Sequence, residues 1–219
     1  MKILAWDTST AFPSVALLND GELAGEINLN IGLRHSSHLL PAINELLRMT
    51  ETTLEEIDVL SATIGPGSFT GIRVGLAMAK ALCFSLNKPF APVISLDALA
   101  LKEESADKVI AAIDAKKGDV FIAEYSGGKR TWGPETVPIE ELWKRDGGTF
   151  IGDAIIRFRT EIEKNLGSRA HISSRTLFIG AETAKIAYEI AMKGQTVGPE
   201  GIFPLYLRAS DAEIKKWGK

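Results

Sequence analysis

The sequence has little of the chemistry that usually marks a catalytic or metal site. A single cysteine stands among 219 residues, which excludes a disulfide framework and a cysteine-based metal cluster. Because Cys83 lies inside an apolar run, we expect it to be a small core side chain rather than a nucleophile or ligand. No Gly-x-Ser-x-Gly or His-Glu-x-x-His segment is present, so neither common type of hydrolytic site has support.

Charge of one sign and long apolar runs are also scarce. The formal net charge is −3, which argues against a protein that grips nucleic acid strongly by itself. Basic side chains gather between Lys116 and Arg159, a pattern typical of a solvated face, with a weak RNA-binding or partner-binding patch as the alternative.

No apolar run reaches about 20 residues, the length that spans a bilayer. Residues 1–7 already predict a strand, leaving no room for a signal peptide. We expect a cytoplasmic protein.

Histidine is rare too, and its three positions do not form a metal-binding pattern. His35 and His38 are one helical turn apart, but His171 lies far along the chain and no acidic pattern completes a ligand set. We favour helix capping or partner contact over metal binding for the pair.

Residues 61–86 form the stretch around which the chain is organised. A short apolar run ends at Gly65-Pro66-Gly67, Ser68 occupies the position of an N-cap, and a predicted helix continues to Leu86. Two apolar sets face nearly opposite sides of this helix: Ile72, Leu76, Ala79 and Cys83, and then Val74, Ala77, Met78 and Ala81. A helix that is apolar almost all round must be covered almost all round. Gly71 and Gly75 leave room for a close-packed neighbour, so the sequence predicts a helix shared with another subunit.

The order of predicted elements repeats in the two halves of the chain. The first half predicts strands at 2–7, 14–18, 22–28, 58–64 and 91–94, with helices through Arg48, from Ser68 and from Ser95. The second half predicts strands at 109–113, 120–125, 131–132, 149–151 and 204–208, with helices at 138–145, 154–165 and 177–192 and from Asp211.

This order predicts an α/β protein of two ribonuclease-H-like lobes, each a mixed five-stranded sheet with flanking helices. Asn19-Asp20-Gly21 predicts a hairpin turn in the first lobe, and residues 53–56 have the pattern of a capping box. We place the first lobe at 1–103 and the second at 104–219, whose terminal helix can pack back on the first.

Two segments suggest a phosphate or metal site. Asp7-Thr8-Ser9, after the first strand, could hold a metal, but the same cluster is ordinary turn chemistry, which we favour on spacing alone. Residues 65–71 lie at a strand-to-helix junction, where anions bind. The third glycine comes one place late for the dinucleotide fingerprint, and no Gly-Lys-Ser/Thr follows for a Walker loop. We therefore favour a tight turn followed by a packing helix.

Several segments together resemble the TsaB (YeaZ) family of bacterial proteins. They are residues 3–10, 35–41, 65–80 and 204–208, of which 65–73 is the most specific. The resemblance is close over the first hundred residues and loose beyond them. It implies the two-lobed fold of actin, Hsp70 and sugar kinases (ASKHA), with a degenerate nucleotide cleft at Asp7, Thr8 and Ser9.

The resemblance also implies partners. TsaB proteins pair with TsaD, the catalytic subunit of the bacterial tRNA threonylcarbamoyladenosine synthase, through helices of the first lobes. TsaE joins as an ATPase, so ATP or ADP is expected at the complex with TsaD and TsaE and not as a cofactor of this chain. TsaC or its relatives supply threonylcarbamoyl-adenylate. The modified base is the adenosine 3′ of the anticodon in tRNAs that read codons beginning with A.

One comparison within that resemblance bears on chemistry. TsaD holds its metal with a His-x-x-x-His motif after a strand, and aligning this motif on residues 93–99 puts Ser95 and Leu99 at the histidine positions. A hydroxyl and an isobutyl group cannot replace two imidazoles as ligands for a metal.

Residues 114–117 also lack a glycine. In nucleotide-binding relatives, a glycine at this place lets the phosphate approach the backbone. We therefore assign no catalytic residue and no metal ligand.

These inferences together predict a non-catalytic scaffold that binds TsaD, pairs with itself when TsaD is absent, and meets tRNA only as the substrate of the complex. The predicted interface comprises residues of two helices: His35, Ser36, Leu39, Leu40, Ile43, Ser68, Phe69, Gly71, Ile72, Gly75, Leu76, Met78 and Ala79. On this hypothesis Gly75→Arg abolishes pairing and leaves the fold intact. The alternative is an autonomous kinase-like phosphotransferase in which Asp7 holds magnesium.

Overall fold

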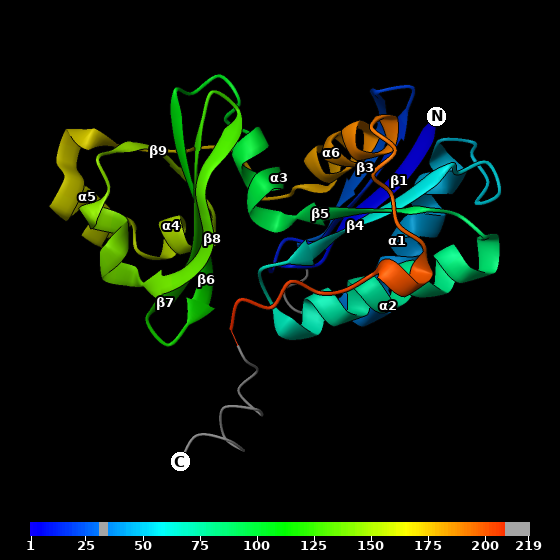
Figure 1. Cartoon of the computed structure of the whole chain (residues 1–219), viewed down its shortest axis with the longest axis horizontal. Coiled ribbons are helices and arrows are strands. Elements are labelled where there is room, and N and C mark those ends of the chain that lie inside the picture. The colour runs from blue at the N-terminus through cyan, green and yellow to red at the C-terminus, as the bar shows by residue number, and fades with distance from the viewer. Residues whose placement is uncertain (31–34, 209–219) are drawn as a thin grey trace, which may run out of the picture.

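Two five-stranded sheets form the centres of two lobes (Figure 1). The computed structural model describes residues 1–30 and 35–208, without the side chains of 35–37. The first sheet has the order β3-β2-β1-β4-β5 and consists of β1 (Lys2–Asp7), β2 (Ser14–Asn19), β3 (Glu22–Asn28), β4 (Val59–Gly65) and β5 (Phe90–Ile94). The second has the order β10-β9-β6-β7-β8 and consists of β6 (Lys108–Lys116), β7 (Asp119–Ser126), β8 (Lys129–Pro138), β9 (Gly148–Ile151) and β10 (Ala170–Ile172).

Both sheets have the same topology, which confirms the predicted pair of mixed five-stranded sheets. In each, an antiparallel meander is followed by two parallel strands. The predicted turn between β2 and β3 places Asp20 and Gly21 at φ 49° and 86°, the left-handed values that a two-residue hairpin turn of type I′ requires.

Helices cover both faces of the first sheet. Side chains of β1 alternate between two apolar cores, so Leu4 and Trp6 face α1 (His35–Met49) and α2 (Phe69–Leu86). Ile3 and Ala5 face the opposite core, which includes α3 (Ser95–Leu101) and α6 (Gly180–Met192). This period of two is the pleat of a strand buried on both sides.

Helix α6 belongs to the first lobe by packing, although the second half of the chain supplies it. It lies along β1 and β2, and Ala181 N donates to Glu26 Oε1 of β3 at 3.1 Å. The chain therefore returns to the first sheet after β10, and the predicted second lobe of 104–219 includes a segment that packs on the first lobe. The terminal helix predicted from Asp211 lies outside the described residues.

Helix α2 is bounded as its sequence predicts. Gly71 N donates to the Ser68 hydroxyl at the N-terminus, and Asn87 adopts a left-handed conformation at the C-cap. Among the described residues, α2 is the one helix that is long and apolar enough to cross a membrane by length and composition alone, and 33% of it is buried. The sequence analysis had predicted no apolar run of that length. Its buried side, which includes Ile72 and Cys83, packs on the core of the first sheet.

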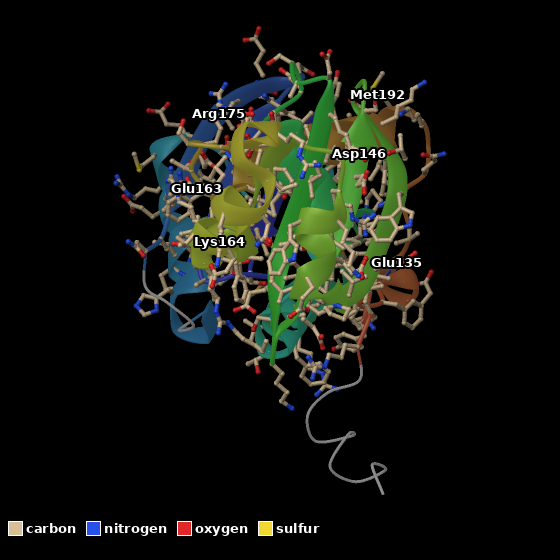
Figure 2. The ribbon with its side chains drawn as sticks, turned by 90° about the vertical axis from the view of Figure 1, so that its left-hand side faces the viewer. Glu135, Asp146, Glu163, Lys164, Arg175 and Met192 are labelled. Atoms are coloured by element: carbon tan, nitrogen blue, oxygen red, sulfur yellow. The ribbon has the colours of Figure 1, made fainter. Side chains whose placement is uncertain are left out.

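The second lobe carries shorter helical elements around a core that includes Ile110, Phe150 and Ile162. They are η1 (Ile139–Lys144), α4 (Asp153–Arg157), α5 (Arg159–Leu166) and η2 (Gly167–Arg169). The short helix η3 (Pro199–Gly201), near the end of the described chain, packs on α2 of the first lobe. Side chains such as Glu163 and Lys164 project outward from α5 (Figure 2). The predicted helix at 154–165 is interrupted at Phe158, and residues 204–208 form no strand.

Candidate functional site

Two buried hydrogen bonds fix the N-terminal half of α2 on β1. Trp6 Nε1 donates to the Gly75 carbonyl at 3.1 Å, and Thr8 Oγ1 donates to the Gly71 carbonyl at 2.8 Å. A Cβ atom at Gly75 would lie 2.4 Å from Thr8 Oγ1. Gly75 therefore makes room for this lobe's own strand, not for a partner. The prediction that Gly75→Arg spares the fold is wrong.

The residues of the predicted interface fall into three groups. One group is buried in the core of this lobe: Leu39, Ile43, Gly71, Ile72, Gly75, Leu76 and Ala79. A second group is exposed or half-buried: Leu40, Ser68, Phe69 and Met78. The third group is His35 and Ser36. Their backbone belongs to α1, and their side chains lie outside the described part of the chain. Only the second group offers described side chains to a partner in this fold.

The outward side of α2 presents an apolar strip. The sequence analysis placed two of its members, Ala77 and Ala81, opposite the buried face but did not include them in the interface. Ala77, Ala81 and Phe84 are exposed at spacings of four and three residues, which puts them on one line along the helix. Phe84 is 82% exposed, and in the described part of the chain no element covers these three residues. We call them the outer strip.

The charged residues of the helix lie on one flank of the outer strip. The Arg73 guanidinium lies 4.2 Å from the centre of the Phe69 ring, and Lys80 Nζ lies 5.3 Å from the Phe203 ring. Tyr206 stacks on Phe69 at 4.8 Å, and its hydroxyl accepts from Arg73 Nε at 3.2 Å. Sequence reasoning missed this C-terminal contact because no periodic pattern in residues 199–208 indicates which element they pack against.

A cavity of about 650 Å³ lies between the lobes, beside the N-terminus of α2. Loops of both lobes line it: Ser9–Ala11 and Pro66–Thr70 from the first, Ile113–Lys116, Phe121 and Asp153 from the second, and Leu205–Arg208 from the C-terminal segment. It corresponds in position to the cleft predicted from the resemblance. Of Asp7, Thr8 and Ser9, only Ser9 lines it.

Asp7 is buried and its carboxylate serves the local turn. Its Oδ1 accepts from the Ser9 amide (2.9 Å), the Ser9 hydroxyl (2.6 Å) and the Thr63 hydroxyl (2.5 Å). This is the Asx-type turn chemistry that the sequence analysis favoured. The Asp7 carboxylate therefore stabilises the end of β1 from inside the lobe.

On the opposite wall the carboxylates also have partners inside the second lobe. Burial raises the pKa of Asp153, and its Oδ1 accepts from the Asp114 amide at 2.9 Å. Asp114 accepts from Lys116 Nζ at 2.7 Å and Arg157 Nη1 at 2.5 Å. Within 1–30 and 35–208, no three His, Cys, Asp or Glu residues are grouped to hold a metal.

The positions aligned with the TsaD histidines lie inside the core. Ser95 and Leu99 are buried on α3, between the sheets. His171 lies on β10 of the second lobe and does not meet α1. Neither observation places imidazole ligands at the cleft.

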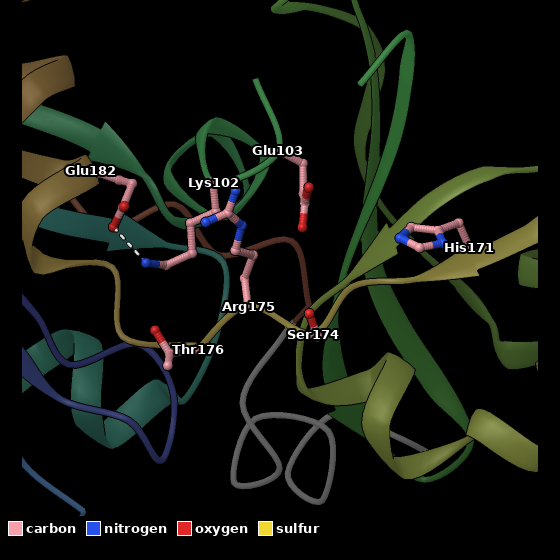
Figure 3. A pocket seen from close by; sticks show the side chains of 7 residues that line it. All are labelled: Lys102, Glu103, His171, Ser174, Arg175, Thr176 and Glu182. Atoms are coloured by element: carbon pink, nitrogen blue, oxygen red, sulfur yellow. Dashed lines mark ion pairs between the residues drawn. The ribbon is translucent and has the colours of Figure 1, made fainter. Parts of the chain in front are cut away.

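A second cavity of about 650 Å³ lies where two connecting segments, 102–107 and 173–179, pass between the lobes (Figure 3). Its carboxylates have partners: Lys102 Nζ lies 3.0 Å from Glu182 Oε2, and the Ser173 hydroxyl donates to Glu103 Oε1 at 2.5 Å. The first contact ties the end of α3 to the start of α6, and the second ties the two connectors together. This polar depression is the join between the lobes.

Known proteins match this chain over most of its length. The family model described as TsaD, tRNA N6-adenosine threonylcarbamoyltransferase, matches residues 31–200. The tRNA threonylcarbamoyladenosine biosynthesis protein TsaB of Escherichia coli K12 is 32% identical over all of both chains. The TsaB of Bacillus subtilis 168 is 29% identical over 98% of this chain and 97% of its own.

Solved structures give the same picture. YeaZ from Pseudomonas aeruginosa superposes with a TM-score of 0.82 at 28% identity, covering 94% of this chain and 99% of its own. An activator of 2-hydroxyisocaproyl-CoA dehydratase from Clostridium difficile, with bound ADPNP, matches at a TM-score of 0.57 and 11% identity over 89% and 97%. This second likeness shows a shared fold.

Proposed function

The chain belongs to the TsaB (YeaZ) family, and on that premise we propose that it is a non-catalytic scaffold subunit that binds TsaD. Its relatives are biosynthesis proteins of tRNA threonylcarbamoyladenosine, and this chain serves the same pathway.

The outer strip is the observation that supports a binding role. Ala77, Ala81 and Phe84 form an exposed apolar line on a helix whose other side is buried in the first lobe. Burying a phenylalanine side chain stabilises a complex by about 1.5–3 kcal/mol. Small residues beside one large aromatic side chain let a second helix approach closely and cover that ring.

TsaD is the occupant that best fits this strip. The TsaD family model matches residues 31–200, so the likeness to the partner covers α1, α2, the strands β4 and β5 of the first sheet and the whole second sheet. Two chains with the same first lobe can present the same helices to each other about a pseudo-twofold axis. In the absence of TsaD, a second copy of this chain can cover the same strip.

The chemistry of the positions at which the resemblance predicts ligands supports a non-catalytic role. Ser95 and Leu99 provide no metal-binding nitrogen, and the Asp7 carboxylate is engaged in its own turn. Catalysis then belongs to TsaD, with TsaE, ATP or ADP, and tRNA meeting the complex rather than this chain alone. We place this reaction of the complex in the cytoplasm.

A substitution on the outer strip tests the binding role. Ala81→Arg places a charge in the centre of the strip, where Ala81 is exposed and the core is untouched. We expect affinity for TsaD of the same organism, measured by calorimetry, to fall on the order of a hundredfold, with an unchanged melting temperature.

Ile156→Arg is the matched control, because Ile156 is also an exposed apolar residue (59%) but lies on α4 of the second lobe. It should leave TsaD affinity unchanged. Normal TsaD binding by the Ala81→Arg protein would exclude the outer strip as the interface, and no TsaD binding by the unsubstituted chain would refute the scaffold role.

The interlobe cavity favours one other candidate, an autonomous kinase-like phosphotransferase. The cavity lies at the N-terminus of an 18-residue helix, where phosphate groups bind readily. Calorimetry of the isolated chain with magnesium and ATP separates the two functions. Micromolar or tighter binding would support the phosphotransferase, whereas the scaffold predicts none at that level.

A further inference from the structure

The C-terminal segment 202–208, which we call the strap, crosses from the first lobe to the second. At its first-lobe end, Leu205 N donates to the Ile64 carbonyl at 2.8 Å. The stacked pair of Tyr206 and Phe69, together with Arg73, holds the strap against α2. Figure 1 shows this segment passing along α2 toward the second sheet.

At its other end, the strap is anchored by one arginine. Arg208 Nη1 lies within hydrogen-bonding distance of the carbonyls of Ala115 (3.0 Å) and Lys116 (3.3 Å) and of Asp119 Oδ2 (3.3 Å). These acceptors surround the turn between β6 and β7. Thr136 of β8 adds a hydrogen bond to the Leu207 carbonyl at 3.2 Å. A planar guanidinium suits such a set of converging oxygens.

The strap and the connectors lie on different sides of the join. The connectors 102–107 and 173–179 meet the N-terminus of α6 through Lys102 and Glu182. The strap meets α2, which covers the opposite face of the first sheet. Between them, Asp97 of α3 accepts from Tyr125 and Arg130 of the second lobe. The two lobes are therefore joined by the connectors and by the apolar core that α3 shares with β6 and β7. On the side of α2, the strap adds hydrogen bonds between them.

We propose that the strap is a latch that holds the lobes closed over the interlobe cavity, with Arg208 as its releasable anchor. Residues 205–208 form part of the cavity wall, so opening the cavity requires the strap to leave one lobe. The Arg208 end is the releasable one, because Arg208 is held by hydrogen bonds at a partly exposed turn, beside the partly buried Leu207. The Tyr206 end has stacked rings as well as hydrogen bonds. Rotation about the connectors then separates α2 from the β6–β7 turn. This inference stands independently of the binding of TsaD.

Distance measurement between two spin labels tests the latch. One label replaces Ser85 on α2 and the other replaces Glu140 on η1; both residues are exposed. Ile139 N donates to the Gly118 carbonyl at 2.8 Å, so η1 moves with the β6–β7 turn. Burial raises the pKa of Cys83 to about 11, so the native thiol stays unlabelled at neutral pH.

In the full-length chain, Arg208→Ala should lengthen and broaden the distribution of distances between the labels. Amide exchange at residues 115–119 should become about tenfold faster, since hydrogen bonds to a charged donor are among the stronger ones. Arg159→Ala is the control, because its ion pair with Glu163 lies within α5 and its removal should change neither readout.

Tyr206→Ala provides a second variant that frees the opposite end of the strap. Tyr206→Ala should also lengthen the distances between the two spin labels, because it removes the ring that stacks on Phe69. Distances that stay the same in both Arg208→Ala and Tyr206→Ala, with the fold intact by circular dichroism, would overturn the latch. Lengthening in only the Arg208 variant would still support Arg208 as the anchor.

Discussion

The two lobes share a sheet but not the helices that surround it. Both sheets follow the same strand order, yet the connections of the first lobe contain helices of 15 and 18 residues, whereas the second has η1, of six residues, and helices of five and eight. A five-stranded sheet therefore does not dictate the length of its crossovers. The longer of the two, α2, is the helix that carries the outer strip.

The largest expected effect concerns the packing of α2 on its sheet. Gly75→Arg should unfold the first lobe, because even a Cβ atom there meets Thr8 at 2.4 Å, and overpacking of a core costs about 1–3 kcal/mol or more. Urea denaturation measures the change, and exposure of the buried Cys83 to a thiol reagent reports it independently. Ala77→Arg, two residues along the same helix but exposed, should stay within about 0.5 kcal/mol of the parent. Equal stability of the two variants would contradict the division of α2 into two faces.

An intermediate effect is expected where α6 is tied to the first lobe. Lys102→Ala leaves Glu182 without its cation in a site where both side chains are about nine-tenths buried (12% and 13% exposed). Breaking such a pair costs about 3 kcal/mol, which the urea midpoint should show. The double substitution Lys102→Met with Glu182→Leu should recover most of the loss, since the charge and its partner leave together. A single variant as stable as the parent would show that this pair does not hold α6.

The smallest expected effect is a difference between the two lobes in how their stability changes at acid pH. The hydrogen bond from Lys2 lowers the pKa of Glu56 to about 2, so the stability it contributes to the first lobe is present above about pH 5 and is lost as the pH falls toward 2. Burial raises the pKa of Asp153 in the second lobe, so that carboxyl favours the folded state at low pH and this contribution is lost as the pH rises.

Urea midpoints between pH 3 and 7 check these opposite signs. Glu56→Gln should flatten the acid loss, and Asp153→Asn should steepen it, because the amide of asparagine keeps the acceptor without the ionisation. Curves that shift in the same direction for both variants would exclude this assignment of the two carboxyl groups.

Local signals in the sequence predicted the sheets and the ends of α2 well. Asn19-Asp20-Gly21 specified a turn through residues that tolerate left-handed conformations, and Ser68 and Asn87 bounded the helix. The capping-box prediction at 53–56 also agrees with the structure, where Thr53 N donates to Glu56 at 2.7 Å. These features depend on neighbours within a few residues, which a sequence displays directly.

Features set by distant packing could not be predicted in the same way. The periodicity of residues 180–192 indicates a helix but not the sheet on which it packs. The glycines of α2 indicate a close neighbour but do not say that Trp6 and Thr8 of β1 are that neighbour. Residues 202–208 have no period at all, because their contacts come from two lobes at once. The resemblance identified the family. The division of α2 into buried and exposed faces depends on how the folded lobe packs, and it became visible only in the structure.

The return of the chain to its first sheet has a consequence for biosynthesis. A ribosome releases the five strands of that sheet by about residue 94, but the helix that closes one face, Gly180–Met192, follows some 86 residues later. Until then the growing polypeptide carries an uncovered apolar surface formed by residues such as Ile3, Ala5 and Leu18. Maturation of the N-terminal half therefore waits until residues 180–192 have been synthesised, and that apolar surface needs protection from aggregation in the interval.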